Sequence, residues 1–125
     1  MHDTRPVYLD LRKIKLPLPG VASILHRVSG VLMFIATPLS LWLLQRSLAN
    51  EQAFAEVRAL LAHPLMMLLV LALLWAVSHH LLAGIRYLLL DLDIGIEKAA
   101  ALRSAQWVLI GGGVLAALLA LGIYL

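Results

Sequence analysis

Long uncharged stretches dominate the pattern of hydrophobic and polar positions along the chain. Three runs of 18, 27 and 22 residues contain no charged side chain: residues 28–45, 59–85 and 104–125. A helix that crosses the hydrocarbon core of a bilayer, which is ~30 Å thick, needs about 20 mostly apolar residues. The pattern therefore predicts an all-α integral membrane bundle of three transmembrane helices, at about residues 21–48, 64–90 and 103–124.

The segments around these runs are more polar. Residues 1–20 contain three prolines, which lack a backbone donor and disfavour helix, so they predict an extended or turn-rich N-terminal segment. Residues 49–63 are polar enough to predict an aqueous loop, and Pro64 suits the first turn of the second helix. We expect residues 1–125 to form a single membrane-anchor domain.

Two features inside the predicted helices bear on their shape. Pro38 lies within the first helix and is expected to kink or locally loosen it. Residues 111–113 are three consecutive glycines in the third helix. Small residues in membrane helices mark places where two helices approach closely, so we expect such a contact there.

The basic residues are distributed unevenly along the chain. Five lie before residue 28, three lie between residues 86 and 103, and two lie between residues 46 and 58. With three helices, the first two groups share one side of the membrane, which gives eight basic residues against two. Because cytoplasmic loops carry the excess of Lys and Arg, the pattern predicts a cytoplasmic N-terminus.

Composition supports the membrane assignment and removes several kinds of site. Hydrophobic residues make up 62% of the chain and charged residues 14%, whereas a soluble domain is about half apolar and a quarter charged. The chain has no cysteine, so it cannot itself hold a disulfide, a zinc–thiolate site, a cysteine-bound iron–sulfur cluster or a cysteine nucleophile. The net charge of +3 follows from topology and gives no support for nucleic-acid binding.

A first group of polar residues lies at the start of the first helix. Since successive helix residues turn by about 100°, Ser23, Arg27 and Gly30 share one stripe, and His26 and Ser29 form the neighbouring stripe. Polar groups inside a membrane are costly and therefore suggest function. The alternative is an interfacial arginine that extends to lipid phosphate, with a serine that caps the helix.

A second group lies late in the second helix. One stripe of this helix carries four residues at the spacing i, i+4, i+7 and i+11, namely His80, Gly84, Tyr87 and Asp91. An imidazole followed one turn later by glycine suits a haem, because the nitrogen reaches the iron and the missing side chain admits the ring. Arg86 near the membrane surface could pair with the propionates. The alternative is that His79 and His80 are hydrogen-bonded inside a helix bundle. Zinc is less favoured, because the remaining histidines are scattered.

Three segments carry a resemblance to a known family. They are Arg-Pro-Val-Tyr-Leu-Asp-Leu at 5–11, Ser-Ile-Leu-His-Arg-Val-Ser-Gly at 23–30, and His-Leu-Leu-Ala-Gly-Ile-Arg at 80–86, followed by Asp91. Together they resemble the larger cytochrome b membrane-anchor subunit of bacterial succinate dehydrogenase (succinate:quinone oxidoreductase, respiratory Complex II). The second and third segments together are specific, and the resemblance spans the whole chain.

The resemblance implies roles for individual residues. His80 would be the axial ligand of a haem b that is shared with a second anchor subunit. Ser23 and Arg27 would contact ubiquinone, since a hydroxyl and a cation can hydrogen-bond a quinone carbonyl and stabilise the charge that develops on reduction. His26, with Arg27, would lie on the propionate side of the haem. Asp91 matches an acidic position near the cytoplasmic mouth and is a candidate for a proton path.

Two positions depart from the family pattern. His79 stands where some members have tyrosine, and Tyr87 stands where some have histidine, which puts a proton-transfer role for position 87 in doubt. His79 and His80 point about 100° apart, so they cannot both bind one face of the iron. The alignment of the motif and the stripe shared with Gly84 select His80.

The expected function is that of a haem b- and ubiquinone-binding anchor that passes electrons from succinate oxidation to ubiquinone. The resemblance implies an iron–sulfur subunit and a flavoprotein subunit on the cytoplasmic side of the bacterial inner membrane, so catalysis belongs to the complex rather than to the isolated chain. The alternatives are the anchor of a fumarate reductase, a small proton or ion transporter subunit without haem, and a structural anchor without a cofactor.

Overall fold

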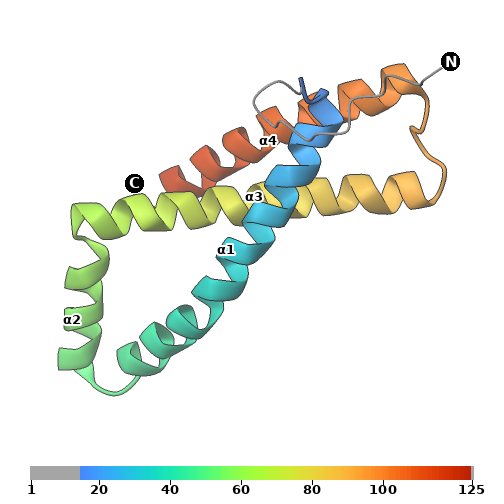
Figure 1. Cartoon of the computed structure of the whole chain (residues 1–125). Helices are drawn as coiled ribbons and strands as arrows, with labels where there is room; N and C mark the ends of the chain where they lie inside the picture. The colour runs from blue at the N-terminus through green and yellow to red at the C-terminus, as the bar shows by residue number, and fades with distance from the viewer. Residues whose placement is uncertain (1–14, 125) are drawn as a thin grey trace, which may run out of the picture.

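The computed structural model describes residues 15–124, and within them it contains four helices and no strand (Figure 1). The helices are α1 (Leu18–Ser47), α2 (Glu51–Leu61), α3 (Pro64–Asp91) and α4 (Lys98–Tyr124). Helices α1, α3 and α4 are long and apolar enough to cross a membrane, which confirms the predicted all-α fold with three spans. Residues 1–14, which include the motif at 5–11, lie outside the described residues.

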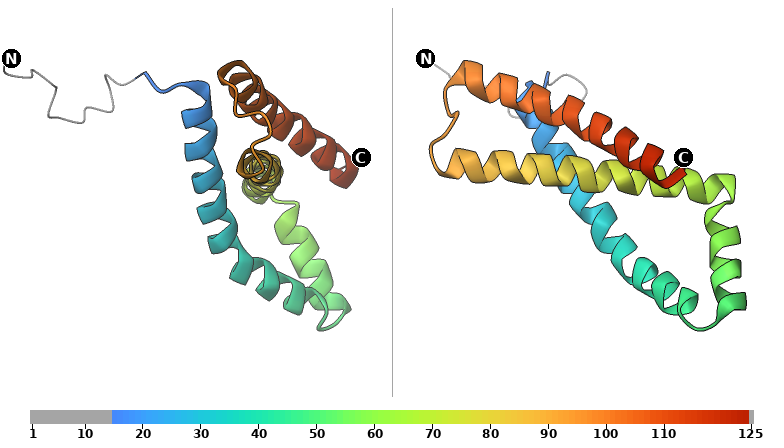
Figure 2. Two further views of the ribbon diagram at one scale, coloured as in Figure 1. Left: turned by 90° about the vertical axis from the view of Figure 1, so that its right-hand side faces the viewer. Right: turned by 180° about the vertical axis from the view of Figure 1, so that it is seen from behind.

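Helix α3 lies between the other two long helices (Figure 2, left). Helix α4 runs back along α3, and α1 crosses α3 at a wide angle (Figures 1 and 2). The buried positions between them are mostly small, as Ala76, Ala83, Ala105 and Gly112 illustrate. Small residues let membrane helices approach closely, so backbone proximity rather than bulky side chains defines this core.

The ends of two spanning helices differ from the sequence prediction. Helix α1 begins at Leu18, three residues earlier than predicted, because a proline is tolerated in a first helical turn. Helix α4 begins at Lys98, five residues before the predicted start at 103, because the segment before the apolar run consists of good helix formers. The chain turns between α3 and α4 with positive φ at Asp93 (59°) and Gly95 (79°).

Helix α1 continues through Pro38 without a break and curves in its C-terminal half (Figure 2, left). A proline inside a helix removes one backbone hydrogen bond and crowds the preceding turn, which permits this bending.

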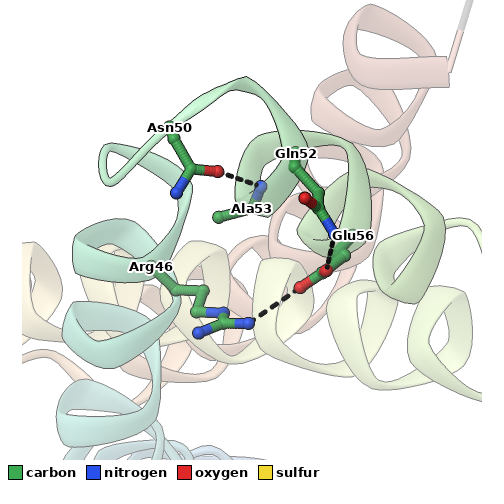
Figure 3. A network of polar contacts seen from close by, with 5 residues as sticks. All are labelled: Arg46, Asn50, Gln52, Ala53 and Glu56. Atoms are coloured by element: carbon green, nitrogen blue, oxygen red, sulfur yellow. Dashed lines mark hydrogen bonds and ion pairs between the residues drawn. The ribbon is translucent and has the colours of Figure 1, made fainter.

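The predicted loop at 49–63 was wrong, because most of it forms α2 (Figure 3). The side chain of Asn50 accepts a hydrogen bond from the backbone N–H of Ala53 at 2.8 Å and so caps the helix. Arg46 at the end of α1 donates to Glu56 at 2.8 Å. This hydrogen bond and charge lower the pKa of the Glu56 carboxyl below its ordinary value, so α2 is attached to α1 by a charged contact.

Candidate functional site

His80 lies where α3 faces α1 and is half-buried. Its ring stacks on the ring of His26, with the centroids 4.1 Å apart and the planes at 23°. Its Nδ1 atom lies 3.2 Å from the carbonyl oxygen of His26 and 3.2 Å from the hydroxyl of Ser29. A proton on Nδ1 is donated to that carbonyl and leaves the lone pair of Nε2 available to a metal, which is how proteins orient histidine ligands.

The close approach of α1 to this imidazole depends on a glycine. A Cβ atom at Gly30 would lie 3.1 Å from Cε1 of His80, tighter than an ordinary contact. Gly30 and the buried Ser29 therefore form the surface of α1 on which His80 packs, called here the seat of His80. The sequence pattern places both residues near His26 but predicts no role for either. The signal in the sequence was that both residues follow His26 by about one helical turn.

His26 supplies a second imidazole to this cluster. Its Nε2 atom is buried and has no hydrogen-bond partner among the described residues. A Cβ atom at Gly84 would lie 3.9 Å from this nitrogen, so the glycine leaves ordinary clearance beside it. The ring of Tyr87 lies 5.3 Å from the ring of His26 at 49°. A buried nitrogen without a partner is costly, and among the described residues the hydroxyl of Ser78 and the Nδ1 of His79 are in the same condition.

His79 is enclosed by three helices. Its side chain is 0% exposed, its ring stacks on Trp75 with centroids 5.4 Å apart, and its Nε2 lies 3.4 Å from the carbonyl oxygen of Ala22. A Cβ atom at Gly112 of α4 would lie 3.1 Å from the Cα of His79. No space for a planar macrocycle remains beside this histidine, and the expected close approach at residues 111–113 is confirmed here.

Ser23 and Arg27 lie one turn apart on α1, near the His26–His80 pair in sequence. Ser23 is half-buried and Arg27 is exposed. Arg27 lines a shallow apolar pocket with Val28 and Val31. Arg27 is therefore the more accessible of the two at the N-terminal end of α1.

Arg86 and Asp91 lie further along α3, and the guanidinium of Arg86 is 5.7 Å from the ring of Tyr87, which in turn lies beside His26. Arg86 is only 7% exposed, and its Nε donates to the hydroxyl of Ser104 at 2.9 Å, so the guanidinium faces α4. Its role beside the haem propionates stays a prediction. Asp91 is the last residue of α3 and is exposed.

Comparison with known proteins identifies the family. The family described as succinate dehydrogenase/fumarate reductase transmembrane subunit matches residues 1–120. The chain is 42% identical over 93 residues to the succinate dehydrogenase cytochrome b556 subunit of Coxiella burnetii, which covers 74% of each chain. It is 32% identical over 114 residues to the cytochrome b556 subunit of Paracoccus denitrificans, covering 91% of this chain and 88% of that one.

A third relative is the succinate dehydrogenase hydrophobic membrane anchor subunit of Archaeoglobus fulgidus, 29% identical over 96 residues, or 77% of this chain and 82% of that one. These relatives are subunits of an enzyme complex, and the three apolar helices make this chain a multi-pass membrane protein. The predicted family is confirmed. The chain belongs to the succinate dehydrogenase/fumarate reductase transmembrane subunit family, as a membrane-anchor subunit.

Proposed function

We propose that this anchor binds haem b through His80 and carries electrons from succinate oxidation to ubiquinone. The observation that supports the proposal best is the seat of His80, whose Nδ1 lies 3.2 Å from the His26 carbonyl oxygen. Such a contact fixes the ring and leaves Nε2 as the ligand atom. The relatives named cytochrome b556 agree with a haem b protein.

The residues around His80 fit a haem. The buried Nε2 of His26 lacks a partner, and we infer that it donates to a propionate, with Arg27 supplying positive charge on the same side. Gly84 leaves clearance next to His26. When bound, the haem supplies one-electron redox chemistry, while these residues hold and orient it. We infer that a second anchor subunit provides the other axial ligand.

Ser23 and Arg27 are the proposed quinone contacts. A hydroxyl and a guanidinium one turn apart can both donate to a quinone carbonyl oxygen. The cation then stabilises the negative charge that develops on that oxygen as ubiquinone is reduced. Asp91, exposed at the end of α3, is the proposed start of the proton path to this site.

Succinate oxidation requires other chains. The sequence has no cysteine to hold an iron–sulfur cluster, so the proposal includes an iron–sulfur subunit and a flavoprotein subunit on the cytoplasmic side. Helical bundles occupy the inner membrane of bacteria, whereas the outer membrane is spanned by β-barrels, so we assign a bacterial protein of this kind to the inner membrane. The family description includes fumarate reductase, and the direction of the reaction depends on cofactors of those other subunits.

The haem assignment is tested on the purified complex by the reduced-minus-oxidised optical spectrum. His80→Ala is expected to remove the haem b signal. His63→Asn is the control, since His63 is exposed at the opposite end of α3 and asparagine can also cap a helix. An intact haem b signal in His80→Ala would show that the ligand assignment is wrong, and a cofactor-free native complex would favour a structural anchor or a transporter subunit.

A second pair of variants tests the seat of His80 without removing the ligand. Gly30→Leu places a side chain where a Cβ atom alone would lie 3.1 Å from His80, so haem content is expected to fall. Gly113→Leu is the matched control, since nothing lies within 4 Å of a Cβ atom there. Equal haem content in the two variants would contradict the role proposed for Gly30.

A further inference from the structure

A mainly apolar pocket between the C-terminal part of α3 and the start of α4 contains one charged lining residue, Arg86. Its volume is about 340 Å³. Arg86 and Ser104 are among its lining residues, which are otherwise mainly apolar and include Leu82, Leu89 and Trp107. The Trp107 side chain is 71% exposed, so the pocket opens toward the surroundings of the helices.

Arg86 is held in place, but some of its N–H donors have no acceptor among the described residues. Its Nε donates to the hydroxyl of Ser104 at 2.9 Å, and its Nη2 donates to the carbonyl oxygen of Ala101 at 3.2 Å. A guanidinium has five N–H donors, so the described residues accept from two of its three nitrogens and leave Nη1 without an acceptor. A cation that is 93% buried, since its exposure is 7%, is costly unless an anion compensates it.

The described part of the chain provides no such anion. Its one recorded ion pair with a carboxylate joins Arg46 and Glu56 at the other end of the molecule. The connection after α3 carries Asp91, Asp93 and Glu97, but all three are exposed and none lines the pocket. Residues 15–124 therefore leave the charge of Arg86 without a carboxylate partner, and a bound anion is one source of the compensating negative charge.

The depth of Arg86 indicates which anion the membrane offers. Helix α3 has 28 residues, which at ~1.5 Å per residue is about 42 Å, the thickness of a bilayer with its headgroups. Arg86 lies five residues before the end of α3, or about 7.5 Å along its axis. This position is close to the boundary between the hydrocarbon core and the headgroups, where the phosphates of phospholipids begin.

We propose that this pocket is a binding site for a glycerophospholipid, with the phosphate diester on Arg86 and an acyl chain along the apolar wall that includes Leu89 and Trp107. A single cation matches the single negative charge of a phosphate diester. Ser104 and Ala101 hold the guanidinium in position, so little ordering is needed when the lipid binds. The inference does not depend on the haem or quinone assignment.

The test is lipid binding to the purified, delipidated complex, measured by native mass spectrometry with phosphatidylglycerol as the probe. Arg86→Gln is expected to weaken binding at least about tenfold, because a charge-assisted hydrogen bond is lost. Arg103→Gln is the matched control, since Arg103 is exposed and adjacent to Ser104 but does not line the pocket. Diacylglycerol, which has chains without phosphate, and glycerol phosphate, which has phosphate without chains, are both expected to bind weakly.

Ala100→Phe provides a variant that keeps the arginine. Ala100 lines the pocket, so a phenyl ring there is expected to exclude the lipid while the haem spectrum stays unchanged. Phosphatidylglycerol binding equal to that of the unsubstituted complex in either Arg86→Gln or Ala100→Phe would overturn the proposal. It would also be overturned if Arg86→Gln lost haem b and kept the lipid, because Arg86 would then serve a haem propionate. Burial of the pocket under a partner protein in the assembled complex would overturn it too.

Discussion

Two adjacent histidines in α3 have opposite environments. His79 is 0% exposed and packs against α1 and α4, while His80 is half-buried and faces His26 and Ser29 of α1. The 100° step between successive helix residues is the cause, because it directs neighbouring side chains to different partners. The motif and the stripe shared with Gly84 selected His80 from the sequence, but the glycine that clears His80 lies on another helix, 50 positions away in the sequence.

The role of Arg27 yields a prediction at this scale. Arg27→Ala is expected to lower quinone reduction by about a hundredfold, since removing one preorganised donor to a developing oxyanion has an effect of that order. Succinate oxidation with an artificial acceptor is expected to survive, because that reaction does not use the quinone. Steady-state assays of both activities in the same preparation provide the measurement.

Arg103→Ala is the control for this experiment, because it removes an exposed arginine of the same predicted membrane side. If Arg27→Ala and Arg103→Ala reduced quinone equally well, the quinone assignment would be wrong.

At the scale of helices, the contact between α3 and α4 depends on backbone proximity. A Cβ atom at Gly112 would lie 3.1 Å from the Cα of His79, which is backbone and cannot move aside cheaply. The run of three glycines predicted such a contact, but only one of them makes it with a backbone atom. Gly111 would meet the flexible end of Leu82, and Gly113 would meet nothing.

This asymmetry predicts different effects of the same substitution at neighbouring positions. Gly112→Val is expected to separate α3 from α4 and to destabilise the protein by about 1–3 kcal/mol, the usual range for overpacking. Gly113→Val is expected to have little effect. Thermal unfolding of the two variants in detergent provides the comparison, and similar midpoints would argue against close packing at Gly112.

Helix α2 shows where sequence reasoning at this scale failed. A short, charged helix contains no long uncharged run, so residues 49–63 were predicted as a loop. Its signals were local, namely the Asn50 cap and the alanine-rich segment that follows. The ion pair between Arg46 and Glu56 depends on how α1 and α2 fold together, and charge patterning alone does not specify it.

At the scale of the whole molecule, the polar groups of the proposed sites lie at one end of the bundle. The start of α1, the end of α3 and the start of α4 share one end of the bundle, since Arg86 contacts Ser104 and His26 contacts His80. The proposed haem, quinone and lipid sites therefore all lie toward one membrane surface. The excess of basic residues predicts that this surface is cytoplasmic.

The absence of cysteine makes this orientation directly testable. Ala55→Cys in α2 and Glu97→Cys before α4 introduce single exposed thiols at opposite ends of the bundle. In intact cells, a membrane-impermeant maleimide is expected to label the cysteine at position 55 and to leave that at position 97 unlabelled until the cells are lysed. The reverse pattern would show that the N-terminus is outside the cytoplasm.

The sequence by itself determined the membrane class, the three spans and the family, because hydrophobic length and short motifs are local properties that survive without coordinates. Only the tertiary structure decided which histidine lies against Ser29 and Gly30, and that Arg86 turns toward α4. The physical reason is that these relations depend on how helices from distant parts of the chain cross. Crossing geometry is set by the fit of many small residues at once, which no local pattern specifies.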